Sequence, residues 1–197
     1  MGRPRSYDET SVVEAARDTF WQHGYELASI GELEERTGLK RSSLYQAFGS
    51  KRGLFEAALR NYIERETEPT LSRMRQPNAG LKEVLAYFKA RARGLRTDPQ
   101  RTARGCLVIN TIAEFGTRDP AIGRLGEAHR KCVHDAFHTA LRQAAACGEV
   151  DAGRVATRAE MLVSAAIGIS LTARVDLAMA ADASDAVAAE VAAWREP

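Results

Sequence analysis

Apolar residues recur at intervals of three and four along most of this 197-residue chain. That spacing is the period of an amphipathic α-helix with one buried face. The pattern is interrupted at glycine, proline and aspartate residues, which commonly end or start helices. The sequence therefore predicts an all-α protein of about nine helices.

Residues 29–51 predict two short helices joined by a tight turn, followed by the start of a third helix. Ser29 precedes Glu32 by three positions, the spacing of a capping box, and Gly38 suits the left-handed conformation that ends a helix. A second helix is predicted from about Lys40. Its inner side holds Leu44, Tyr45 and Phe48, and its outer side presents Arg41, Ser42, Ser43 and Gln46. The outer side is rich in hydrogen-bond donors, as DNA recognition requires.

Lys40 stands where a Ser, Thr, Asp or Asn cap is expected. A cation at a helix N-terminus is disfavoured by the helix dipole by up to about 1 kcal/mol, and a nearby phosphate would remove that penalty. We therefore expect Lys40, Arg41 and the free amides of the first turn to hold a DNA phosphate. The alternative is a solvated basic surface.

Longer helices flank this pair on both sides. One covers residues 8–23 and ends at Gly24, and the other starts at Ser50, has Lys51 in its first turn and ends near Pro69. Because the second of these helices joins the two halves of the chain, it is the natural element to transmit a change in tilt from one half to the other.

Five further helices are predicted in the remaining sequence. They cover approximately 81–95, 105–115, 119–147, 156–180 and 184–194. The last two have small or apolar residues on more faces than a solitary monomer would bury, so they predict a dimer surface. A purely intramolecular core is the alternative.

Candidate ligand-binding residues lie in this C-terminal half. Cys106, Asn110 and Glu114 are four apart and share one face of an apolar helix. Buried polar groups need partners, so these three line a ligand cavity or tie the helix to its neighbours. The full predicted ligand-binding set is Phe88, Cys106, Asn110, Glu114, Phe137 and Met161.

The sequence predicts no metal site, no cofactor and no enzymatic activity. His134 and His138 have metal-ligand spacing on a helix but lack a third convergent ligand. Three alternatives stay open: a regulator that responds to oxidation or a soft metal at Cys106, an all-helical enzyme that pairs Cys106 or Cys132 with a histidine, and a protein that coats DNA without sequence preference. No local signature supports the enzyme.

The distribution of charge and the composition indicate where DNA would bind and in which compartment the protein works. Residues 1–35 hold three basic and eight acidic side chains, whereas residues 36–60 hold six basic and one acidic, so positive charge gathers on the predicted DNA-reading region. The basic arm that contains Arg5 would reach phosphates or a minor groove. Three cysteines without paired spacing, no apolar run of membrane length and no signal-peptide core predict a cytoplasmic protein without a membrane partner.

The segment TGLKRSSLYQAFGSKRGLF resembles the TetR family of bacterial one-component transcriptional regulators. The resemblance covers residues 7–62 well, and the rest of the chain matches in length, helical character and the block GCLVINTIAEFG. It implies a helix-turn-helix DNA-binding domain of three helices at 1–50, a linking helix at about 51–68, and a helical ligand-binding and dimerisation domain at 51–197. It further implies that Tyr45 and Lys51 contact the DNA backbone, and that 156–194 pairs with its twin. Lys40 departs from the serine that is commoner in the family.

Together these inferences predict a sequence-specific regulator of transcription. We expect a homodimeric repressor that binds a pseudo-palindromic operator in double-stranded DNA and is released by a small-molecule effector. Arg41 is the candidate for a guanine contact, with Ser42, Ser43 and Gln46 as lesser base readers. Lys40, Tyr45, Lys51 and Arg5 are expected to hold phosphates.

Overall fold

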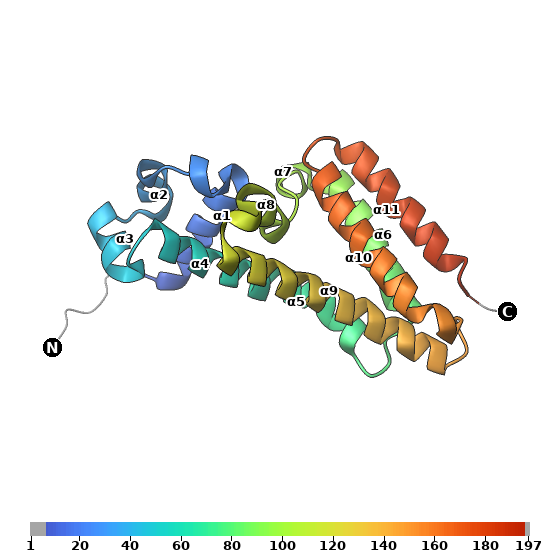
Figure 1. Ribbon diagram of the computed structural model, residues 1–197. Helices are drawn as coiled ribbons and strands as arrows, with labels where there is room; N and C mark the ends of the chain where they lie inside the picture. The colour runs from blue at the N-terminus through green and yellow to red at the C-terminus, as the bar shows by residue number, and fades with distance from the viewer. Residues whose placement is uncertain (1–6, 196–197) are drawn as a thin grey trace. The chain divides into compact units, whose positions relative to one another are not determined.

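The structure, a computed structural model, describes residues 7–195, so the predicted contact of Arg5 lies outside the described residues. Eleven α-helices, with short 3₁₀ and π segments, make up the described part of the chain (Figure 1). Nine of these helices have eight residues or more, which confirms the predicted all-α fold. The chain divides into two compact units, the first ending at Thr67 and the second beginning at Glu68.

The first unit is built from four α-helices and a π-helix. They are α1 (Glu9–Leu27), α2 (Ile30–Thr37), α3 (Arg41–Phe48), α4 (Lys51–Tyr62) and the π-helix Ile63–Thr67. Helix α1 packs against both α2 and α4. Phe20 of α1 meets Phe55 of α4 edge to face with ring centroids 4.9 Å apart, and Trp21 meets Tyr62 in the same way at 4.9 Å. Because aromatic side chains bury large areas, these pairs hold the unit together.

Helix ends in the first unit follow the predicted caps, with one correction. Ser29 accepts a hydrogen bond from the Glu32 N–H at 3.1 Å, but the Glu32 carboxylate lies 3.0 Å from Nε2 of His23. The predicted capping box is therefore only half formed. Gly24 breaks α1 with φ 80° as predicted, and a short helical stretch continues beyond it to Leu27.

The second unit contains the other helices. They are α5 (Glu68–Ser72), α6 (Leu81–Thr97), α7 (Pro99–Thr102), α8 (Leu107–Phe115), α9 (Pro120–Ala146), α10 (Val155–Thr172) and α11 (Leu177–Ala192), with 3₁₀ turns at Arg73–Arg75, Gly116–Arg118 and Ala152–Arg154. Phe88 of α6 and Phe137 of α9 stack inside it with centroids 5.7 Å apart and planes 7° apart. Both are fully buried, so this stack lies in the core that α6, α9, α10 and α11 share.

The predicted break between the last two helices is wrong by several residues. We expected helices at 156–180 and 184–194, but α10 ends at Thr172 and α11 starts at Leu177. Asp176 is the N-cap of α11, and its carboxylate accepts from the Met179 N–H at 2.9 Å. The alanine-rich sequence around it favours helix on both sides, so periodicity alone did not locate the cap.

Helix α10 also corrects the expectation that no segment is long and apolar enough to span a membrane. Residues Ala152–Thr172 are long and apolar enough by length and composition alone. In this fold α10 packs against α8, α9 and α11, as the core helix of a folded domain does.

A π-helix interrupts the predicted linking helix. Residues Ile63–Thr67 follow α4 directly and lead into α5. Pro69 lies in α5 and has no N–H for the carbonyl of Arg65, which an unbroken α-helix would use. Single π turns inside α-helices are rare and often mark functional positions.

Gly105 permits the closest backbone approach in the second unit. Its φ is +67°, and a Cβ atom at this position would lie 2.6 Å from the backbone carbonyl oxygen of Ser170 in α10. We expect Gly105→Ala to lower the free energy of unfolding by about 3 kcal/mol, since strain in the left-handed region adds to a clash with backbone. Thermal melting measures this, and a loss of about 6 °C or more is expected.

Gly148 is the matched control for this prediction. Its φ is +74° but nothing lies within 4 Å of its added Cβ, so Gly148→Ala should lose only about 1 kcal/mol from backbone strain. Equal losses for the two variants would contradict the role of the approach between Gly105 and α10.

Candidate nucleic-acid interface

Helix α3 presents a polar face outward from the first unit. Leu44 is buried with 1% of its surface exposed, while Arg41, Ser42 and Gln46 are exposed and Ser43 is half-buried. The preceding turn ends α2 with Gly38 at φ 70°, as predicted. The helix therefore has one side fixed in the core and the other available to base edges.

Arg41 and Tyr45, one turn apart on α3, are in contact. The guanidinium carbon of Arg41 lies 5.1 Å from the centroid of the Tyr45 ring, within the range of a cation–π interaction. Tyr45 is half-buried. The ring thus restricts the long Arg41 side chain before it meets any partner, which lowers the entropy lost on binding.

The start of α3 differs from what the sequence suggested. Lys40 is the N-cap residue, as predicted, and its side chain makes no capping hydrogen bond. The Arg41 N–H, however, donates to the carboxylate of Glu34 on α2 at 2.8 Å. A carboxylate of the protein itself therefore occupies part of the site where we expected a phosphate to offset the helix dipole.

Lys51 makes two contacts within the first unit. Its Nζ lies 3.4 Å from the backbone carbonyl oxygen of Glu26 and 4.5 Å from the centroid of the Tyr25 ring. The side chain is half-buried. Lys51 therefore ties the start of α4 to the end of α1, a structural role that sequence reasoning did not identify.

Gly53 is a further residue that sequence reasoning missed. A Cβ atom here would lie 2.0 Å from the carbonyl oxygen of Phe48 at the end of α3. Only glycine permits the first turn of α4 to pack this closely on the end of the recognition helix. The available signal was a glycine in the first turn of a helix, where glycine is otherwise unfavourable by about 1 kcal/mol relative to alanine.

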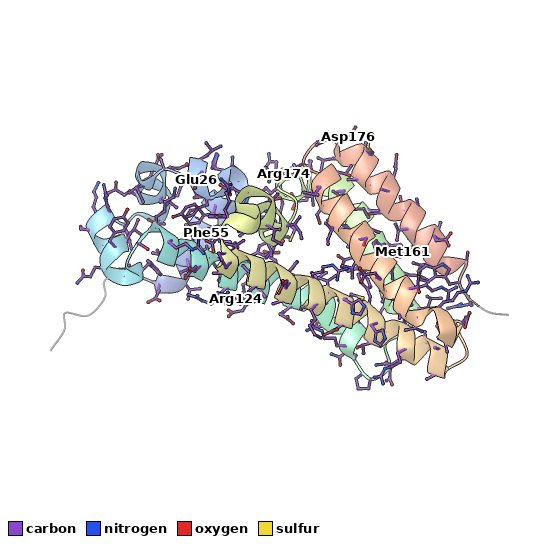
Figure 2. All side chains as sticks on the ribbon, viewed as in Figure 1. Glu26, Phe55, Arg124, Met161, Arg174 and Asp176 are labelled. Carbon is purple, nitrogen blue, oxygen red and sulfur yellow. The ribbon has the colours of Figure 1, made fainter. Side chains whose placement is uncertain are left out.

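The six predicted ligand-binding residues lie in different surroundings. Phe88 and Phe137 stack in the core, whereas Met161 of α10 is 44% exposed (Figure 2). Asn110 donates from Nδ2 to the carbonyl oxygen of Arg104 at 2.8 Å. The aromatic pair is thus part of the core, Met161 is open to solvent, and Asn110 has a local partner.

Cys106 lies beside a histidine that the sequence did not single out. It is the N-cap residue of α8, and its Sγ lies 3.8 Å from Nε2 of His129 on α9. His129 is only 9% exposed. Glu114, which was expected on the same face as Cys106, is half-buried near the end of α8.

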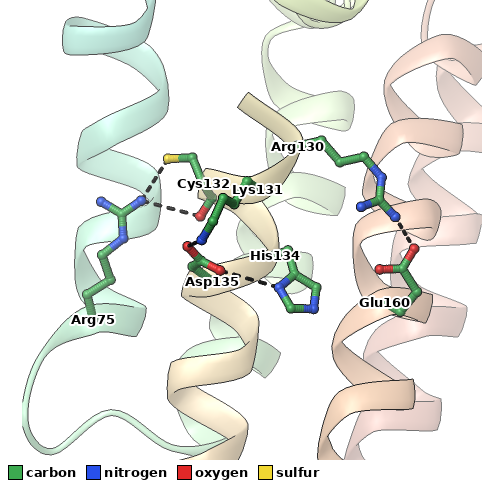
Figure 3. A network of polar contacts seen from close by, with 7 residues as sticks. All are labelled: Arg75, Arg130, Lys131, Cys132, His134, Asp135 and Glu160. Carbon is green, nitrogen blue, oxygen red and sulfur yellow. Dashed lines mark hydrogen bonds and ion pairs between the residues drawn. The ribbon is translucent and has the colours of Figure 1, made fainter. Parts of the chain in front are cut away.

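Polar contacts anchor α9 to its neighbours (Figure 3). Arg75 donates to Sγ of Cys132 at 2.8 Å and pairs with Glu68 at 2.7 Å, and Arg130 pairs with Glu160 of α10. Burial raises the pKa of the Cys132 thiol, and the charge of Arg75 only partly opposes this effect. Cys132 therefore favours the protonated form.

The neighbouring groups on α9 form a surface network (Figure 3). Lys131 donates to Asp135 at 2.5 Å, and this hydrogen bond lowers the pKa of the Asp135 carboxyl. His134 and His138 stack with centroids 5.7 Å apart. Among the described residues no group of three or more His, Cys, Asp or Glu side chains is placed to hold a metal ion.

The arrangement of α1 to α4 defines a helix-turn-helix DNA-binding protein, and comparisons with known proteins specify the family. The family described as bacterial regulatory proteins, tetR family, matches residues 12–58, and the tetracyclin repressor-like C-terminal domain matches residues 80–185. The chain belongs to the TetR family of transcriptional regulators.

Individual relatives agree with this assignment. The chain is 33% identical over 151 residues to the uncharacterized HTH-type transcriptional regulator YezE of Bacillus subtilis, covering 77% of each chain. It is 31% identical over 175 residues to the HTH-type transcriptional repressor ComR of Escherichia coli, covering 88% of this chain and 82% of ComR. Both relatives are named as regulators of transcription.

A solved structure shows a similar fold bound to DNA. The TetR family regulator CifR, as a cysteine-substituted variant in complex with a 26 bp double-stranded operator, is 27% identical to this chain. The similarity has a TM-score of 0.82 and covers 98% of this chain and all of that one. The protein described here is accordingly a DNA-binding transcriptional regulator.

Proposed function

We propose that this protein is a homodimeric repressor that reads its operator through α3 and leaves it when a small molecule binds the second unit. The exposed donors of α3 support the first part, and the name of the relative ComR supports repression. A two-fold dimer presents two copies of α3, so the operator would be pseudo-palindromic with half-sites roughly 34 Å apart or a multiple of that. This proposal places the protein in the cytoplasm with the DNA.

The observation that carries the DNA-binding role is the outer face of α3. Arg41 stands at its first position, exposed and braced by Tyr45, where a guanidinium would reach the O6 and N7 atoms of a guanine. Ser42, Ser43 and Gln46 extend the same helix, and Lys40 precedes it. Lys40, Tyr45 and Lys51 are the proposed phosphate contacts.

Exposed apolar side chains of the second unit support the proposal of a dimer. Met161 and Leu171 on α10 are 44% and 42% exposed, and Val175 and Met179 just beyond it are 89% and 61% exposed. Gly168 has nothing within 4 Å of an added Cβ. Exposed apolar and small residues suit close packing against a second copy, so we propose that α10 and α11, within 156–194, form the dimer interface.

Buried polar atoms without a hydrogen-bond partner support the proposal of an effector site in the second unit. Nε of Arg91 on α6 and Oδ1 of Asn110 on α8 are buried and have no hydrogen-bond partner. Such groups cost free energy unless a partner satisfies them. A small molecule that carries both acceptors and donors would supply the missing partners, whereas Phe88 and Phe137 act as core residues.

Substitutions at Arg41 and Lys51 test the DNA-binding proposal. Arg41→Ala should weaken binding to the operator by about 1 to 3 kcal/mol with little effect on random DNA, since it removes a base contact. Lys51→Ala should weaken both and lower the salt slope by about one counterion unit. Fluorescence anisotropy against both duplexes at several salt concentrations measures these effects. Equal losses on the two duplexes for Arg41→Ala would contradict base reading.

Substitution of Gly168 tests the dimer. Gly168→Arg places a long cation in the middle of the exposed α10 face, so we expect a monomer by light scattering and at least about a tenfold loss of operator affinity. Ala90→Arg on the exposed side of α6 is the control and should stay dimeric. A Gly168→Arg variant that remains dimeric would locate the interface elsewhere.

A thiol input at Cys106 is the second candidate, favoured by the contact with His129. A helix N-terminus and an adjacent imidazole both favour a reactive thiolate. Iodoacetamide should therefore alkylate Cys106 faster than Cys132, whose pKa burial raises, as peptide mass spectrometry would show. If iodoacetamide releases the wild type and Cys147→Ser from the operator but does not release Cys106→Ser, the regulatory input is the Cys106 thiol. Alkylation of Cys106 without release would leave the small molecule as the input.

A further inference from the structure

Helix α3 begins without a cap of its own. Lys40 occupies the N-cap position and has no oxygen in its side chain, so it accepts nothing from the first turn. In the other helices of the first unit the cap is local: Asp8, Ser29 and Ser50 each accept from an N–H two or three residues ahead. The helix that carries the DNA-reading residues is therefore the exception in this unit.

Glu34 of α2 supplies the missing acceptor from seven residues away. Its Oε1 accepts from the Arg41 N–H at 2.8 Å, while its backbone carbonyl accepts from the Gly38 N–H at 3.0 Å. Glu34 thus binds both the end of α2 and the start of α3. The side chain is half-buried, and a carboxylate at a helix N-terminus is further stabilised by the helix dipole.

We propose that Glu34 is a positioning residue for DNA recognition, acting as a cap between helices in place of a local serine. Its hydrogen bond fixes the backbone of Arg41 and so the direction in which the guanidinium leaves α3. This leaves position 40 free for a cation, and Lys40 is exposed there, where its ammonium can contact a phosphate. The arrangement gains a phosphate contact and places one negative charge close to the DNA.

Glu34 affects DNA binding in two ways, through its negative charge and through its cap on α3. The two effects have opposite signs, which makes the proposal testable. Loss of the carboxylate removes repulsion from phosphates and strengthens binding to any duplex. Loss of the cap loosens α3 and weakens binding to the operator alone, because the base contacts depend on its position. The ratio of operator affinity to random-DNA affinity isolates the second effect.

The experiment uses the full-length protein, an operator duplex selected from a random library by the wild type, and a scrambled duplex of the same length. Glu34→Ala should lower the affinity ratio about three- to tenfold, as expected for a lost cap. Glu35→Ala is the matched control, since it removes the same charge from an exposed neighbour on α2. It should leave the ratio unchanged.

Rescue distinguishes positioning from a general effect on stability. Glu34→Gln keeps an acceptor without the charge and should retain most of the ratio. Lys40→Ser restores a local cap, so the double variant Glu34→Ala with Lys40→Ser should regain the ratio that Glu34→Ala loses, although it binds both duplexes more weakly. Equal ratios for Glu34→Ala and Glu35→Ala, or no recovery in the double variant, would overturn the proposal. The requirement that α3 reads DNA is tested separately by Arg41→Ala.

Discussion

The helices that would meet DNA are too short to be stable alone. Helices α2 and α3 have eight residues each, and an isolated helix below about 12 residues is marginal in water. Their conformation therefore depends on the buried side chains Leu33 and Leu44 and on hydrogen bonds at their ends. The aromatic contacts between α1 and α4 provide the rigid support on which both short helices rest.

Local features of the sequence predicted most of the fold. Ser29, Gly38 and Ser50 cap or end helices as expected, because each acts within four residues along the chain. The contact from Glu34 to Arg41 could not be predicted, since it depends on how two helices cross. The surroundings of the predicted ligand-binding residues could not be predicted for the same reason. Periodicity assigned Met161 to one face of a helix, but it does not indicate which residues that face contacts.

Two of the cations predicted to meet DNA already contact other groups of the protein. Lys51 was predicted as a phosphate contact, yet its ammonium already lies beside the Glu26 carbonyl and the Tyr25 ring. Arg41 likewise stacks on Tyr45. Both cations are thus held in defined positions before binding, which reduces the conformational entropy that a protein–DNA contact would otherwise lose.

The π-helix at Ile63–Thr67 follows α4 directly, so the helical period changes at Ile63. Each residue of an α-helix advances by about 100° around the helix axis, at 3.6 residues per turn, whereas a π turn closes its hydrogen bond one residue later along the chain. A pattern of buried positions that is counted through residues 51–68 with a single period is therefore out of register after Ile63. The buried face of α4 and that of the residues beyond it have to be assigned separately.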